Sequence, residues 1–182
     1  MNNFEKKIVI FFNRFHGKRI DFASKAISNI SFLTLLWVTI IAFSMLVDLK
    51  FGFEILLKLG MVFVIHYIIS EGFIKYGAKK FSFQRIRPYV AYPDQIKGIG
   101  RNFSDSSFPS SHMSSVTGGL IVLYTAYAGA LPALIIFGAL LAISRLHNGM
   151  HYPTDILAGI VLGFGYGWLA IALVNIFMQF VK

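Results

Sequence analysis

The segment S-R-L-H-N-G-M-H-Y-P-T-D, residues 144–155, places four ionisable side chains between two long apolar runs. These side chains are Arg145, His147, His151 and Asp155. A histidine can act as a nucleophile or a general acid, and a nearby carboxylate can fix the tautomer of its ring. An arginine can hold an oxyanion. Because ionisable groups at membrane depth are costly and usually line a site, the segment indicates chemistry on an anionic substrate.

Two further clusters carry side chains of the same kinds. K-F-S-F-Q-R-I-R-P, residues 80–88, contributes Lys80 and Arg87, and P-S-S-H, residues 109–112, ends in a histidine. The expected topology delivers all three clusters to one side of a membrane. Together they hold three histidines, an aspartate and several cations, which is a set of groups suited to phosphoryl transfer. No metal-binding motif is evident in this set.

Each member of these clusters also has a purely structural explanation. Ser110 or Ser111 can cap a helix, and Asp155 in the first turn of a helix is favoured by the helix dipole. Arg145 at the end of a span can extend to the interface. None of these explanations requires His112, two residues into an apolar helix, so the set as a whole favours a functional site.

The composition predicts an all-α, polytopic membrane helix bundle that forms a single domain over residues 1–182. The chain is 56% hydrophobic and only 14% charged, and a membrane-spanning helix needs roughly 20 apolar residues. A turn near Ala128–Pro132 divides one long uncharged stretch into two crossings. Five transmembrane helices are expected, near residues 28–48, 54–75, 110–129, 131–147 and 154–180.

Three other segments have distinct expected roles. Residues 4–22 predict an amphipathic helix on the bilayer surface, which would become a sixth span if it crossed the membrane. Residues 76–108 form the only long polar loop and are expected to be the active-site loop. Gly159, Gly163 and Gly167 follow the small-residue spacing that lets transmembrane helices pack closely.

The net charge of +9 is unevenly distributed. With five spans, fourteen of the seventeen Lys and Arg residues fall on one face, which charge topology alone would place in the cytoplasm. An anionic ligand such as a lipid phosphate explains the same excess, and nucleic acid is not expected as a partner. The chain has no cysteine, which excludes disulfides and thiolate metal sites.

The order and spacing of these motifs resemble the phosphatidic acid phosphatase type 2 superfamily of membrane lipid phosphatases, relatives of vanadium haloperoxidases. The pattern K-x6-R-P, then P-S-G-H, then S-R-x5-H-x3-D is matched by Lys80, Arg87, Pro88, Pro109, Ser110, His112, Ser144, Arg145, His151 and Asp155. Ser111 is a departure, because the family usually has glycine there.

The resemblance implies a mechanism without metal or cofactor. His151 would attack phosphorus to form a phosphohistidine, Asp155 would orient its ring, and His112 would protonate the leaving group and then activate water. The substrate oxygens would be bound by Lys80, Arg87, Ser110, Ser111 and Arg145.

Other functions remain open at this point. A lipid phosphotransferase would use the same site but pass the phosphate to another lipid. An anion transporter would only bind phosphate at the basic residues, without hydrolysis. A metal site built from His112, His147, His151 and Asp155 is disfavoured, because the neighbouring cations would oppose a metal ion.

The expected partners are a phosphorylated lipid substrate and membrane lipids, and the sequence does not indicate an oligomeric state. Lipid A phosphate is the first expectation for the substrate, since small bacterial members of the family have a similar size and short N-terminus. Phosphatidylglycerol phosphate, phosphatidate and undecaprenyl diphosphate are the alternatives. The resemblance implies a bacterial inner membrane with the site facing the periplasm, against the charge asymmetry.

Overall fold

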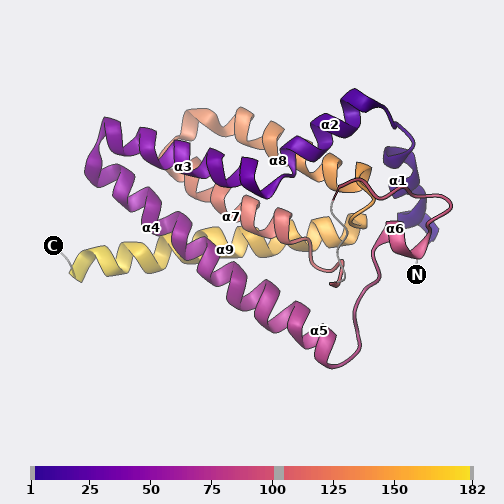
Figure 1. Ribbon diagram of the computed structural model, residues 1–182. Coiled ribbons are helices and arrows are strands. Elements are labelled where there is room, and N and C mark those ends of the chain that lie inside the picture. The colour runs from indigo at the N-terminus through magenta and orange to yellow at the C-terminus, as the bar shows by residue number, and fades with distance from the viewer. Residues whose placement is uncertain (1–2, 101–104, 181–182) are drawn as a thin grey trace.

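In the computed structural model, which describes residues 3–100 and 105–180, all regular secondary structure in those ranges is helical (Figure 1). The elements are α1 (Asn3–Asn13), α2 (Lys18–Ile27), α3 (Ile30–Val47), α4 (Leu49–His66), the π-helix η1 (Tyr67–Lys75), α5 (Tyr76–Lys80), α6 (Pro88–Ala91), α7 (Ser111–Ala126), the 3-10 helix η2 (Ala128–Ala130), α8 (Leu131–His147) and α9 (Pro153–Phe180).

Four helical stretches in the described ranges are long and apolar enough to cross a membrane. They are Ile30–Val47, Leu49–Lys80, Ala128–His147 and Pro153–Phe180. The remaining predicted span, near residues 110–129, corresponds to α7, which has 16 residues and is therefore about 24 Å long at 1.5 Å per residue. That is shorter than the roughly 30 Å hydrocarbon core, so α7 does not belong to these four.

Helix α7 lies in the middle of the bundle, alongside α4, α8 and α9 (Figure 1). The glycines of α9 that follow the predicted small-residue spacing face α7, so the two helices lie close together. A Cβ atom on Gly163 would lie 2.5 Å from the carbonyl oxygen of Ser114, and one on Gly159 would lie 2.8 Å from that of Ser110. No side chain fits there, so these glycines set the distance between the two helices that carry the predicted site.

The outer faces of the long helices are apolar and exposed. Leu35 and Leu46 on α3, Ile135 on α8 and Val161 on α9 are 65%, 85%, 60% and 70% exposed. An apolar surface of this extent is typical of contact with lipid or another protein. It agrees with the apolar composition of the helices that carry it.

The N-terminal segment differs from the predicted single helix over residues 4–22. It forms two helices, α1 and α2, that break at residues 14–17 and pack on α8, while α1 also reaches α9. Asn13 at the end of α1 is buried, and its Nδ2 atom donates to the carbonyl oxygens of His147 (2.6 Å) and Lys97 (2.9 Å). Specific hydrogen bonds, and not only an apolar face, hold this segment to the bundle.

The predicted active-site loop over residues 76–108 also has different bounds. Helices α4, η1 and α5 run on as one helical stretch to Lys80, and α5 projects beyond the rest of the bundle (Figure 1). The irregular connection therefore begins after Lys80, and it contains the short helix α6. Part of the predicted loop, residues 101–104, lies outside the described residues. The expected turn before α8 is present as η2.

Candidate active site

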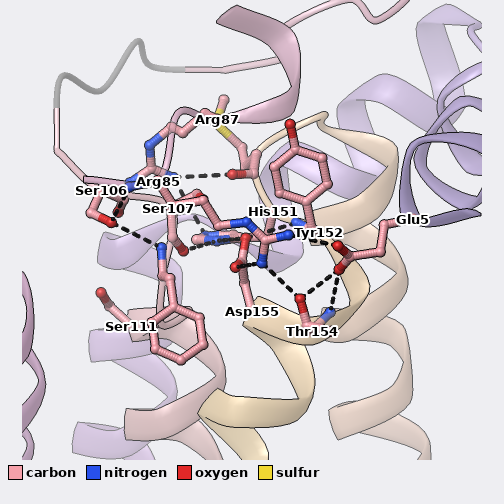
Figure 2. Close-up of polar contacts among 12 residues, drawn as sticks. Glu5, Arg85, Arg87, Ser106, Ser107, Ser111, His151, Tyr152, Thr154 and Asp155 are labelled. Carbon is pink, nitrogen blue, oxygen red and sulfur yellow. Dashed lines mark hydrogen bonds and ion pairs between the residues drawn. The ribbon is translucent and has the colours of Figure 1, made fainter. Parts of the chain in front are cut away.

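His151 lies in the short connection between α8 and α9, among residues from three separate segments (Figure 2). Its Nδ1 atom is 2.8 Å from the carbonyl oxygen of Ser107 and 3.8 Å from Oδ2 of Asp155. Its Nε2 atom is 3.5 Å from Nη1 of Arg87. Because the carbonyl oxygen can only accept, Nδ1 carries the proton and the lone pair is on Nε2.

The surroundings of His151 keep its ring neutral. Burial lowers the pKa of His151 well below its usual value, and the positive charges of Arg145 and Arg87 lower it further. A neutral imidazole with an unprotonated Nε2 atom is the nucleophilic form. The same two cations would attract an anionic substrate towards that atom.

Asp155 occupies the first turn of α9 and is completely buried. Its Oδ2 atom accepts from the amide of Tyr152 at 2.8 Å, and its Oδ1 atom pairs with Nη1 of Arg85 at 2.6 Å. The carboxylate therefore orders the turn that carries His151, as well as placing negative charge near its ring. Its backbone carbonyl accepts from the amide of Ser110, which joins the start of α9 to the start of α7.

Arg85 connects this turn to the N-terminal helix (Figure 2). Its Nη2 atom lies 2.7 Å from Oε2 of Glu5 in α1, and its Nη1 atom also donates to Oγ1 of Thr154 at 2.7 Å. Glu5 in turn accepts from the Thr154 hydroxyl. Helix α1 is thus part of the scaffold that holds Asp155.

A second group of charges lies on the other side of Arg87. The carboxylate of Asp105 is 2.7 Å from Nη2 of Arg87 and 2.9 Å from Nζ of Lys75. Lys75 also donates to Oγ of Ser111 at 2.5 Å, and Ser111 donates to Glu71 at 2.6 Å. Lys75 and Glu71 come from the π-helix η1, an irregularity often found at functional sites.

Asp105 is ionised in this arrangement. Burial opposes its charge, but Lys75 and Arg87 more than offset that effect and lower the pKa of Asp105 below its usual value. Its side chain is 40% exposed, whereas those of Lys75 and Arg87 are 8% and 4% exposed. A half-exposed carboxylate thus bridges two buried cations. Two phosphate oxygens in the places of the two carboxylate oxygens would contact the same two cations.

His112 and Arg145 face a cavity of about 320 Å³ at the same end of the bundle. The Nε2 atom of His112 lies 2.9 Å from the carbonyl oxygen of Ser28, which follows α2. Arg145 is 4% exposed, and its Nε atom has no hydrogen-bond partner among the described residues. The cavity is also lined by Met150, the neighbour of His151. A buried guanidinium with unused donor capacity beside a cavity suits an anion.

The two predicted serines differ in their contacts. Ser110 is the N-cap residue of α7, but its hydroxyl makes no capping bond and has no partner within the described ranges. The capping explanation for this side chain is therefore not realised, and the buried hydroxyl is available to a ligand. Ser111 instead bonds Lys75 and Glu71 through its hydroxyl.

Lys80 is not brought to the other predicted residues. It is exposed at the end of α5, and the contact described for it is with the ring of Phe81, 5.8 Å from Nζ to the centroid. His147 likewise turns away from His151 and contacts Asp21. The remaining predicted residues, Arg87, Ser110, Ser111, His112, Arg145, His151 and Asp155, are at the end of the bundle where α7 and α9 begin and α8 ends.

Several polar residues of this site were not predicted from the sequence. They are Glu5, Lys75, Asp105 and Ser107, together with the role of Arg85. The sequence pattern could have indicated Lys75, because it directly follows the apolar run of residues 55–74 and lies one helical turn after Glu71. Nothing in the sequence pattern marks Ser107, which contributes a backbone carbonyl.

Comparison with known proteins supplies a family. The profile described as "PAP2 superfamily" matches residues 55–179, which is more than half of the chain. The decaprenylphosphoryl-5-phosphoribose phosphatase of Mycolicibacterium smegmatis is 39% identical over 76 residues, which cover 42% of this chain and 39% of that protein. The lipid A 4'-phosphatase of Bacteroides thetaiotaomicron is 25% identical over 182 residues, which cover 93% of this chain and 76% of that protein.

A solved structure has a similar fold. The PAP2-type phosphatidylglycerolphosphate phosphatase of Bacillus subtilis superposes with a TM-score of 0.65 at 21% identity, covering 98% of this chain and 86% of the other. The match to the mycobacterial relative spans less than half of that relative's length. Together with the four candidate spans, these relationships make this chain a multi-pass membrane protein with bacterial homologues.

Proposed function

This chain belongs to the PAP2 superfamily, and on that premise we propose that it is a lipid phosphatase that works through a phosphohistidine on His151 without a catalytic metal. The observation that supports this most directly is the state of His151. Its Nε2 lone pair lies beside Arg87, under the field of Arg145, in a fully buried setting. A nucleophile next to buried cations suits attack on an anionic phosphate.

The proposed reaction has two displacements at phosphorus. In the first, Nε2 of His151 forms a bond to phosphorus as the bond to the lipid oxygen breaks, and His112 gives a proton to that oxygen. In the second, His112 accepts a proton from water, the water oxygen bonds to phosphorus, and the P–N bond breaks to release phosphate. Asp155, 3.8 Å from the ring, stabilises the positive charge that the ring carries in between.

The cations divide into an inner and an outer group in this proposal. Arg87, Arg145 and the Ser110 hydroxyl contact the phosphate oxygens, and Lys75 takes the role that the family pattern gives to Lys80. The Asp105 carboxylate is displaced from Lys75 and Arg87 when phosphate binds. Ser111 positions Lys75, and exposed Lys80 meets lipid headgroups at the interface.

The proposed setting is a bacterial inner membrane in which α7 makes a fifth crossing inside the bundle, shielded by its neighbours. His112, His151 and Asp155 then lie at headgroup depth, so a lipid keeps its tails in the bilayer while its phosphate enters the site. Lipid A phosphate is the first proposed substrate, because the relative of that specificity aligns along 93% of this chain. Polyprenyl phosphates and phosphatidylglycerol phosphate are the next candidates.

A release assay with one purified preparation tests the proposal. Lipid A, undecaprenyl diphosphate, phosphatidylglycerol phosphate and phosphatidate are each offered in mixed micelles with excess EDTA. Release of phosphate from at least one lipid is expected, and absence of release without added divalent metal would contradict the proposal. Adding an acceptor lipid separates hydrolysis from transfer, since a phosphotransferase forms a new phospholipid and releases little free phosphate.

The proposed orientation is testable because the chain has no cysteine. Exposed Asp94 follows α6 at the site end, and exposed Lys50 lies in the first turn of α4, at the opposite end where α3 and α4 meet (Figure 1). In spheroplasts, a membrane-impermeant maleimide should label Asp94→Cys directly and Lys50→Cys only after permeabilisation. The reverse pattern would place the site in the cytoplasm, where the charge asymmetry alone puts it.

A further inference from the structure

A second cluster of ionisable groups lies outside the site just described, where the α1–α2 corner meets the end of α8 (Figure 1). It consists of His16, Asp21 and His147. Oδ1 of Asp21 is 2.9 Å from Nε2 of His147 and 3.6 Å from Nδ1 of His16. One nitrogen or oxygen atom from each of the three residues lies within 4.8 Å of the other two.

Each ring nitrogen of His147 has an oxygen atom as its hydrogen-bonding neighbour. Nδ1 of His147 is 3.0 Å from the carbonyl oxygen of Phe12, and Nε2 is 2.9 Å from the carboxylate of Asp21. Both neighbours are acceptors, but a neutral imidazole has one N–H. If Nδ1 donates to the carbonyl, the lone pair of Nε2 points at a carboxylate oxygen. A positive ion, either a proton or a metal, must lie between these two atoms.

We propose that His16, Asp21 and His147 form a binding site for a divalent transition metal ion of the Zn²⁺ type. Two imidazole nitrogens and one carboxylate oxygen are a common zinc ligand set, and ligands 2.0–2.1 Å from zinc stand about 3.3 Å apart in a tetrahedron. The observed separations of 2.9 and 3.6 Å bracket that value. The bond from His147 Nδ1 to the Phe12 carbonyl is the outer hydrogen bond that metal-binding histidines usually make.

The electrostatic surroundings of this cluster differ from those of the active site. The salt bridges described for Asp21 are both to histidines, which can bind a metal in their neutral form. Nearby Arg14 is stacked on the rings of Phe11 and Phe15. At the active site, by contrast, Arg87 and Arg145 would repel a metal ion. His16 is exposed, so an ion can enter from the aqueous side and keep a water as its fourth ligand.

The position of this site gives the ion a structural role. It would fasten the α1–α2 corner to α8. Helix α1 brings Glu5 to Arg85, and the end of α2 brings the Ser28 carbonyl to His112. A bound ion would therefore stabilise the N-terminal helices against the catalytic end of the bundle without taking part in the reaction.

The test is zinc binding by the full-length protein in detergent micelles, after its affinity tag has been removed. After dialysis against ZnCl₂ and then against buffer, elemental analysis should find about one zinc per chain. Zinc should also raise the Tm of thermal unfolding. His16→Ala should reduce zinc affinity by more than the 10–100-fold that loss of an outer hydrogen bond costs, and Asp21→Asn should do the same.

Two controls keep this result specific. His151→Ala should retain zinc binding, because its ring belongs to the active site, and His147→Gln tests the buried ligand if that variant folds. His16→Ala is the main variant, since its exposed side chain can be removed without disturbing the core. Absence of zinc binding by the unmodified protein, or unchanged binding by His16→Ala, would overturn the proposal and leave an imidazolium–carboxylate pair between His147 and Asp21.

Discussion

The Nδ1 atom of His151 lies 2.8 Å from the carbonyl oxygen of Ser107, a full ångström closer than it lies to the carboxylate of Asp155. The backbone carbonyl thus fixes the tautomer, a task that the motif pattern alone would assign to Asp155. Asp155 is held by Tyr152 and Arg85 and supplies negative charge at a distance. Removing that charge and removing the nucleophile should therefore have different consequences.

His151→Gln should eliminate phosphate release and also the covalent phosphoenzyme, because no group is left to form the P–N bond. Asp155→Asn should still form the phosphoenzyme but turn over roughly 10²-fold more slowly, within the range typical of acid–base contributions. The measurement is acid-quench labelling with ³²P-lipid beside steady-state release. Both proteins must show a wild-type melting profile. Measurable turnover by folded His151→Gln would show that His151 is not the nucleophile.

The cations offer a second comparison, between Lys75 and Lys80. Lys75 is buried and bonded to Asp105 and Ser111, whereas Lys80 is exposed and contacts Phe81. Lys75→Gln should reduce kcat/KM by about 10²–10³-fold, as loss of one preorganised charge at a transition state does. Lys80→Gln should change it by less than about 10-fold. The two variants alter the same net charge, so each is the control for the other. Equal losses would restore Lys80 to the site.

The sequence was informative about the site where the chemistry depends on a residue type at a fixed distance from a span end. Successive spans cross in alternating directions, so the chain returns to the same end of the bundle after every second span. That end holds Arg87, His112, Arg145, His151 and Asp155. The sequence was uninformative where position depends on helix phase and length. Lys80 matches the motif spacing, but the helix continues past Lys75, which carries Lys80 about 7.5 Å further along the axis.

The number of spans and the shape of the N-terminus illustrate a second limit. Hydropathy marks α7 as apolar, but it cannot distinguish a crossing exposed to lipid from a shorter helix enclosed by its neighbours. Similarly, periodicity over residues 4–22 cannot show that Asn13 docks onto backbone carbonyls of distant segments. Contacts between segments far apart in the chain decide both features. The glycine spacing of α9, in contrast, was predicted because the close approach needs no partner residue of a particular type.

Asp105 should compete with phosphate for Lys75 and Arg87. Its carboxylate contacts both cations at 2.9 and 2.7 Å, so a bound phosphate must displace it. Asp105→Asn removes the competing charge and should lower the inhibition constant of inorganic phosphate by roughly 10-fold, which corresponds to about 1.4 kcal/mol. The assay is competitive inhibition of lipid hydrolysis near neutral pH, where the lowered pKa of Asp105 keeps the wild-type carboxylate ionised.

Asp94→Asn is the matched control for this effect, because Asp94 is an exposed acid in the same irregular connection. It removes the same charge from the basic face and should leave the inhibition constant nearly unchanged. If Asp105→Asn weakens phosphate binding, the carboxylate positions the two cations for the substrate and does not compete with it.

The contact between α7 and α9 gives the last prediction, which concerns the scaffold. A Cβ atom on Gly163 would lie 2.5 Å from the carbonyl oxygen of Ser114, while one on Gly165 of the same helix meets nothing within 4 Å. Gly163→Ala should therefore force the helices apart and cost about 1–3 kcal/mol, as overpacking of a filled core does. Gly165→Ala should have little effect on stability. Thermal unfolding in detergent measures both, and activity should fall with Gly163→Ala because α7 carries His112 and α9 carries Asp155. Equal melting temperatures for the two variants would mean that α7 and α9 are not packed backbone to backbone at Gly163.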